Sequence, residues 1–209
     1  IAVVCNPAAQ SNQAMPQVGL SAAGGIGGKW GSPSGDDGER GTVYVNDITA
    51  LPGTLMGSIV VVPGATNWTP VNVTVSNGWV TLPDGLRLAV ASNVYFGGSG
   101  AKMELSANSP LSCGQLDLRG GTLSCFSLTC GSNLTLDAAT LVNYSNVLCG
   151  GNLVLTNSSA FHVYAQATNG ALPYGALVAV TGNVSLATNC WVYPYCDATN
   201  GGAPWFRMS

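Results

Sequence analysis

The cysteines are the side chains of this sequence with the clearest chemistry, and three of them recur at one repeat position. Cys113, Cys130 and Cys149 each follow a short apolar stretch and precede a glycine, and Thr181 is expected at the same position in a fourth copy. If the copies stack as neighbouring strands, equivalent Cα atoms lie about 4.8 Å apart, within reach of a disulfide. A buried ladder of reduced thiols, acting as small hydrophobic side chains, fits the same spacing equally well.

The other cysteines and the acidic residues supply weaker candidates for chemistry. Cys190 and Cys196 are close in sequence and could pair across a loop. The segment Asp36-Asp37-Gly38-Glu39 could bind Ca²⁺ but lacks alternating ligand spacing, so a solvated loop with Arg40 as its local partner is favoured. No histidine accompanies the cysteine column and no pair of C-x-x-C motifs occurs, so we expect neither a metal site there nor any cofactor.

A catalytic arrangement is hard to assemble from this sequence. His162 is the only histidine, and strand alternation places it on the face opposite Phe161 and Val163. Asp117 and Arg119 share an outward face, but Thr135 replaces the aspartate in the next copy. We therefore expect a protein that is not an enzyme, with a carbohydrate-active lyase or hydrolase as the alternative.

Aromatic side chains near the C-terminus are the best indication of binding. Trp191, Tyr193, Tyr195 and Trp205 fall close together in sequence, and an aromatic platform can stack on sugar rings. The alternative is that these rings cover the side of the molecule or an adjoining turn.

The elements that would position these residues are strands. No segment keeps the apolar stripe of an amphipathic helix, and Gly, Pro, Asn and β-branched residues interrupt every window. Short alternating stretches predict strands at 42–45, 71–75, 86–90, 93–96, 116–118, 134–136, 153–155 and 177–180.

Self-similarity decides how these strands are arranged. Leu116, Leu134, Leu153 and Val184 begin equivalent apolar-x-apolar strands, at intervals of 18, 19 and 31 residues. Glycines precede them, and Asn133, Asn152 and Asn183 form one column, as expected of corners where Asn adopts a left-handed conformation and hydrogen-bonds to the next copy. Fixed corners and one loop of variable length predict a parallel β-solenoid, an all-β fold.

The domain organisation follows from the same pattern. Residues 1–50 contain two strands around a long Gly-rich loop that belongs to the solenoid or caps it, and residues 51–209 form its turns. By a 31-residue match, Pro204 to Ser209 corresponds to Pro173 to Val178, so the chain is expected to stop before its next corner and to be part of a longer one.

Composition limits the partners. Only 7% of the residues are charged, 46% are hydrophobic and the net charge is −3, so a nucleic-acid partner has no electrostatic support. No apolar run approaches the roughly 20 residues of a membrane-spanning helix. The seven cysteines favour an oxidising compartment.

Some segments resemble a known class of proteins. Ser21 to Gly25 followed by Gly41 to Val45, the Gly-Asn-Leu-x-Leu turns, and Trp191 to Tyr195 followed by Ala198 to Gly201 are similar to large secreted bacterial proteins of repetitive β-helix, such as autotransporter passenger domains. The resemblance implies a right-handed, extracellular parallel β-helix that continues at both ends, and it carries no catalytic motif. We expect a structural or adhesive surface protein whose main partner is itself, with a glycan-binding module as a further alternative.

Overall fold

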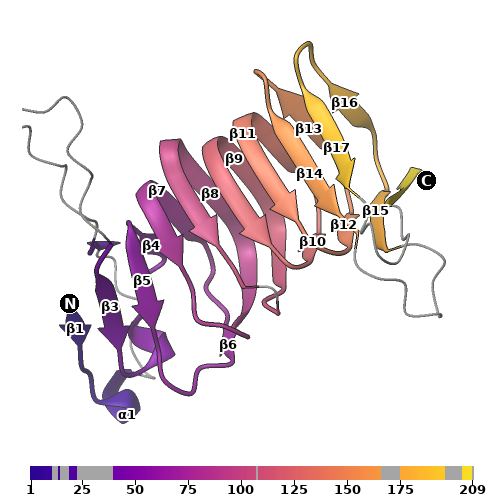
Figure 1. Cartoon of the computed structure of the whole chain (residues 1–209). Helices are drawn as coiled ribbons and strands as arrows, with labels where there is room; N and C mark the ends of the chain where they lie inside the picture. The colour runs from indigo at the N-terminus through magenta and orange to yellow at the C-terminus, as the bar shows by residue number, and fades with distance from the viewer. Residues whose placement is uncertain are drawn as a thin grey trace, which may run out of the picture.

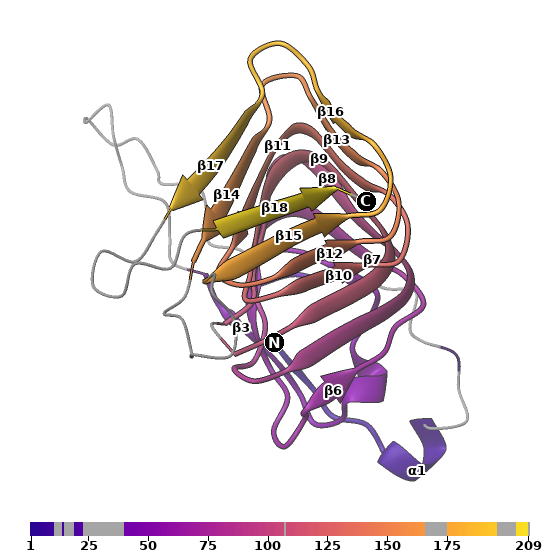
Figure 2. The same ribbon diagram turned by 90° about the vertical axis from the view of Figure 1, so that its right-hand side faces the viewer.

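The chain coils into a parallel β-solenoid of about six turns (Figure 1). The computed structural model describes residues 1–10, 14, 19–22, 40–106, 108–165, 175–195 and 204–208. All strand pairings among them are parallel. Viewed along the axis, the turns enclose a three-sided core (Figure 2). The predicted all-β solenoid is confirmed, and its right-handed coil stays a prediction.

Each turn contributes to three faces, which we call A, B and C. Four long strands bend around corners and so belong to more than one face: β7 (Val73–Thr81), β8 (Arg87–Glu104), β9 (Leu111–Cys125) and β11 (Leu134–Asn143). Face A contains the first parts of β8 and β9 together with β6 (Asn67–Trp68), β10 (Leu128–Cys130), β12 (Val147–Cys149), β15 (Ala176–Val180) and β18 (Pro204–Met208).

The other two faces complete the triangle. Face B contains β2 (Gly19–Leu20), β4 (Thr54–Leu55), β13 (Leu153–Thr156), β16 (Val184–Leu186), the first parts of β7 and β11 and the middle of β8 and β9. Face C contains β1 (Ala2–Val3), β3 (Thr42–Val45), β5 (Ser58–Val61), β14 (Ala160–Tyr164), β17 (Trp191–Tyr195) and the ends of the long strands. The strands at 2–3 and 42–45 therefore extend the stack, while residues 23–39 of the Gly-rich loop lie outside the described residues.

Inward-pointing side chains of successive turns stack into apolar ladders. Leu116, Leu134 and Leu153 pair in register and are almost completely buried, and Val184 follows them in the next turn. The predicted intervals of 18, 19 and 31 residues are thereby confirmed. Full burial of one such leucine stabilises the fold by roughly 1.5–3 kcal/mol, and no single turn can bury its own apolar line.

Asparagine and glycine build the corner between faces A and B. The Asn152 backbone N–H donates to Asn133 Oδ1 at 3.0 Å, and the Asn183 N–H donates to Asn152 Oδ1 at 2.9 Å. The glycines are needed here because the turns approach closely: a Cβ on Gly182 would lie 2.5 Å from Asn152 Oδ1, and one on Gly151 2.7 Å from Asn133 Oδ1. Positive φ, expected at this corner, occurs instead at the other two: between faces B and C at residues that include Gly121, Ala138 and Asn157, and between faces C and A at Gly64 and Gly85.

Two alignments made from the sequence are wrong. Val180, not Thr181, pairs with Cys149. Val184 follows Val180 by four positions, just as its partner Leu153 follows Cys149 by four positions. Pro204 pairs with Ala176, a spacing of 28 rather than 31 residues. The reason is that the segment between β17 and β18, residues 196–203, is three residues shorter than the segment between β14 and β15, residues 165–175.

Helical structure is minimal, as predicted. The described residues contain one four-residue α-helix, α1 (Pro7–Gln10), and one 3₁₀ turn, η1 (Ile48–Ala50), whose N-cap Asp47 accepts a hydrogen bond from the Thr49 backbone. Within the described part of the chain, no helix has the length and apolar character needed to cross a membrane.

The close approach of the corner glycines predicts a position-specific sensitivity. Gly151→Ala should lower the free energy of unfolding by about 1–3 kcal/mol, because its Cβ would meet backbone atoms of Ser132 as well as Asn133 Oδ1. Gly100→Ala, where an added Cβ has open space, is the control and should change stability by less than about 0.5 kcal/mol. Chemical denaturation measures both, and equal losses would contradict the steric argument.

Candidate functional site

The cysteine column lies inside the solenoid on face A. Cys130 pairs in register with Cys113 on one side and with Cys149 on the other. The three residues are 6%, 1% and 2% exposed for Cys113, Cys130 and Cys149. The six described cysteines are free thiols in this structure, and the three of the column stack as a ladder; the disulfide alternative for this column stays a prediction. Val90 and Val180 continue it in the flanking turns.

Local contacts make the three thiols unequal. Cys130 Sγ donates to the Asn133 carbonyl oxygen at 3.1 Å, and Cys149 Sγ donates to the Ser132 carbonyl oxygen at 3.3 Å. Hydrogen bonding with Cys113 lowers the pKa of Cys130 to about 7, and the same interaction, added to burial, raises the pKa of Cys113. Burial raises the pKa of Cys149. Cys130 is therefore the most acidic of the three thiols.

The remaining cysteines are not part of this column. Cys125 is buried in face C, where Asn143 Nδ2 donates to its sulfur at 3.6 Å and burial raises its pKa to about 12. Cys190 is half-buried, and Cys196, its predicted partner, lies outside the described residues.

An aromatic ladder covers the outer side of face C at its C-terminal end. It consists of six residues from three turns: Tyr144, His162, Tyr164, Trp191, Tyr193 and Tyr195. Tyr164 stacks on Tyr195 with ring centroids 4.5 Å apart, and His162 stacks on Tyr193 at 4.8 Å. The pairing of β14 with β17 produces these stacks, because it sets His162 beside Tyr193 and Tyr164 beside Tyr195.

The ladder differs from the predicted cluster in two ways. Trp205 lies in β18, which belongs to face A and pairs with β15, so it is not in the same strand ladder as Trp191. His162, Tyr164 and Tyr144 join the ladder instead, and the 31-residue spacing of Tyr164 from Tyr195 was a usable signal for this. As predicted, His162 points away from buried Phe161 and Val163, and partial burial lowers its pKa.

Stacking between turns determines what the ladder can bind. Its rings lie face to face along the solenoid axis, so they present mainly edges to the side of the molecule. Among the described residues, the β17 rings form the last layer, and their faces opposite β14 are directed along the axis. Trp191 is 55% exposed there.

A second aromatic site lies further back on face C and was not predicted. The Trp79 indole is held between two cations, with Arg40 Cζ and Lys102 Nζ each 3.6 Å from the ring centroid. Its Nε1–H donates to Glu104 Oε2 at 3.0 Å, and Arg40 Nη1 donates to Thr81 Oγ1 at 2.8 Å. Trp79 and Lys102 are register partners, a relation hidden in the sequence by the irregular spacing of this part of the repeat.

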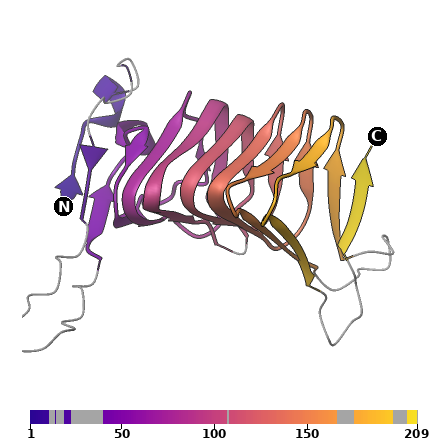
Figure 3. The same ribbon diagram turned by 90° about the horizontal axis from the view of Figure 1, so that it is seen from above.

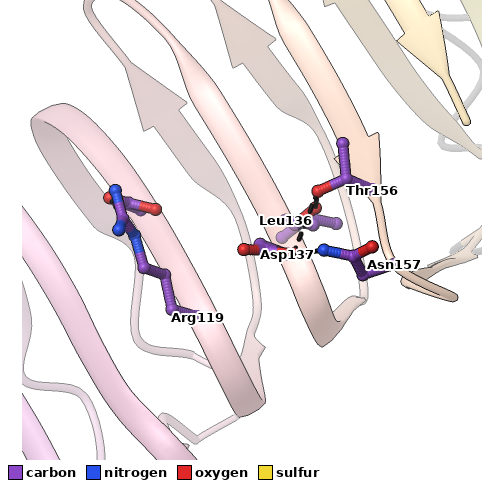
Figure 4. A network of polar contacts seen from close by, with 6 residues as sticks. Arg119, Leu136, Asp137, Thr156 and Asn157 are labelled. Carbon is purple, nitrogen blue, oxygen red and sulfur yellow. Dashed lines mark hydrogen bonds and ion pairs between the residues drawn. The ribbon is translucent and has the colours of Figure 1, made fainter.

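Face B carries the carboxylates that an enzyme would require on neighbouring turns. Asp117 Oδ2 pairs with Arg119 Nε at 3.0 Å, with Thr135 at its register position in the next turn. Asp137 accepts hydrogen bonds from Thr156 Oγ1 at 3.1 Å and Asn157 Nδ2 at 2.6 Å (Figure 4). Both carboxylates therefore engage neighbouring side chains of the solenoid wall.

An apolar hollow marks the C-terminal end of the core. It has a volume of about 340 Å³ and is lined by seven apolar side chains and one arginine: Leu153, Val178, Val180, Val184, Leu186, Val192, Pro194 and Arg207. Leu186 is the register partner of fully buried Leu155, yet it is 50% exposed because no further described turn covers it.

Metal ligands are not grouped in the described part of the chain: no cluster of three or more His, Cys, Asp or Glu side chains occurs there. The weak calcium candidates Asp36, Asp37 and Glu39 lie outside it, and Arg40 contacts Trp79 and Thr81. Comparisons of the chain with protein-family models, with curated proteins and with solved structures find no match.

Proposed function

We propose that this chain is a structural or adhesive β-solenoid of the cell surface or extracellular space, and that copies of it associate end to end. The observation that carries the proposal is the apolar hollow at the C-terminal end, with half-exposed Leu186 at a position that is fully buried one turn earlier. A further solenoid turn is the natural occupant, because it would continue every ladder that reaches this end.

Strand direction supports a second copy as that occupant. All described pairings are parallel, and β16 and β17 each pair on one side only, with β13 and β14. At the opposite end of the stack (Figure 3), β1 pairs with β3 alone among the described strands, and Ile1 and Val4 are exposed. A copy displaced along the axis would present β1 in the same direction as β17, so head-to-tail contacts could repeat without closing.

The finer features of the proposal come from the sequence. The resemblance to autotransporter passenger domains supports an extracellular location and a right-handed coil. A surface with 7% charged residues suits stacked turns, since equivalent like charges would otherwise lie one turn apart.

Leu186→Lys should separate the copies, because it places an ammonium group in the apolar contact. We expect self-association, measured by analytical ultracentrifugation of the wild-type chain, to weaken at least about tenfold. Leu148→Lys is the matched control: Leu148 is 42% exposed on the outer side of face A, away from the hollow, and its substitution should leave association unchanged. A wild-type chain that stays monomeric at high concentration, or equal effects of both substitutions, would contradict end-to-end assembly.

Glycan binding is the second candidate function, favoured by the exposed rings of β17. Neutral aromatic faces without competing charges suit the apolar faces of pyranose rings. Trp191→Ala should weaken binding to an array of neutral oligosaccharides by about tenfold, through loss of the most exposed ring. Tyr95→Ala, which removes an exposed tyrosine of face B, should not change it. Retention of all array signals by the Trp191 variant would argue against this site.

A further inference from the structure

We infer that Cys113 and Cys130 form an oxidisable dithiol that closes into a disulfide between adjacent turns when the protein meets a small peroxide. The inference is independent of end-to-end assembly, since both residues lie in the middle of the solenoid. The cysteine column would then be a site of oxidative modification as well as part of the buried core.

Backbone pairing holds the two residues at the separation that a disulfide needs. Cys130 lies directly beside Cys113 in the parallel ladder, and the Gly131 N–H donates to the Cys113 carbonyl oxygen at 2.8 Å. Register partners in adjacent parallel strands have Cα atoms about 4.8 Å apart, within the range of roughly 4.4–6.8 Å seen for disulfides. Both side chains point into the core from the same face, at register positions of adjacent strands.

Cys130 has two register partners, and the local contacts favour Cys113 over Cys149. Cys149 Sγ donates to the carbonyl oxygens of Ser132 and Asn152, at 3.3 and 3.5 Å, and Cys130 Sγ donates to that of Asn133 at 3.1 Å. The side-chain hydrogen bond between Cys113 and Cys130 lowers the pKa of Cys130 and raises that of Cys113. We therefore assign Cys130 as the nucleophile and Cys113 as the resolving thiol.

The reaction balances with hydrogen peroxide as the oxidant. The Cys130 thiolate attacks one peroxide oxygen, the O–O bond breaks, and Cys130 sulfenic acid and hydroxide form. The Cys113 sulfur then attacks the sulfenic sulfur, the S–O bond breaks, and water leaves with the Cys113 proton. Overall, two thiols and one peroxide give one disulfide and two water molecules. A small oxidant is specified because the two side chains are only 6% and 1% exposed.

Closure would lock one turn to the next. The linked residues are 17 positions apart, one complete turn of the solenoid, so the bond would join two strands that are otherwise held by backbone hydrogen bonds. The cross-link restricts the unfolded chain and should raise Tm by about 5–10 °C.

The test is disulfide mapping of the full reduced chain after treatment with hydrogen peroxide. Free thiols are alkylated before digestion, and mass spectrometry identifies linked peptides. We expect a Cys113–Cys130 link in the wild-type chain and in Cys149→Ser, its loss in Cys113→Ser, and a higher Tm for the oxidised protein that dithiothreitol reverses. The wild-type map is decisive by itself, so the inference does not depend on the folding of any variant.

The pH dependence of oxidation gives a second measurement. The yield of the Cys113–Cys130 link after a fixed peroxide exposure should rise with pH through the neutral range, because the thiolate is the reacting species and the pKa of Cys130 is lowered. A link from Cys130 to Cys149, a link to any other cysteine, or a folded wild-type chain whose Cys113 and Cys130 stay reduced under peroxide would overturn the inference.

Discussion

The parallel hydrogen bonding between successive turns is the constraint on which the rest of the structure depends. It brings residues 17 to 42 positions apart in sequence side by side, so each paired position in a turn has a partner at the equivalent position of the next turn. Leucines therefore stack on leucines, cysteines on cysteines and aromatic rings on aromatic rings. The cysteine column and the aromatic ladder are consequences of this register, because the pairing of successive strands is sufficient to bring their side chains together.

The same constraint explains how polar groups are placed. The side chains of Asn133 and Asn152 accept from the corner N–H groups of Asn152 and Asn183 in the next turn, where a side chain in place of glycine would collide with them. The charged groups of Asp117 and Arg119 meet within one turn rather than between turns. Lys102 lies over the Trp79 ring, and Glu104 accepts a hydrogen bond from the Trp79 indole N–H. Their register partners in the next turn, Thr122 and Ser124, are uncharged. A chain with few ions can therefore build a long wall without electrostatic repulsion.

Fold class and the central register could be predicted from the sequence because the strands after residue 110 repeat with recognisable corners. Cys130 beside Cys149 and Leu134 beside Leu153 follow directly from that alignment. The rest was harder, since register depends on the length of each loop. Because one loop is shorter by three residues, Pro204 pairs with Ala176 and not with Pro173. In the first half of the chain the strands bend and their spacing is irregular, so the sequence showed no repeat that would pair Trp79 with Lys102. The type of corner was also missed, because glycine at the corner between faces A and B serves close approach alone, whereas the positive-φ glycines lie at the other corners.

Register also distinguishes the two binding proposals at the C-terminal end. In a ladder, each ring face is covered by the ring of the next turn, as Tyr164 is covered by Tyr195. The faces that remain, those of β17, are directed along the axis toward the same side as the hollow beside Leu186. A further turn would cover both the rings and the hollow, whereas a sugar would cover the rings alone. The apolar hollow therefore favours protein association as the main role of this end, and a glycan would compete with it for Trp191 and Tyr193.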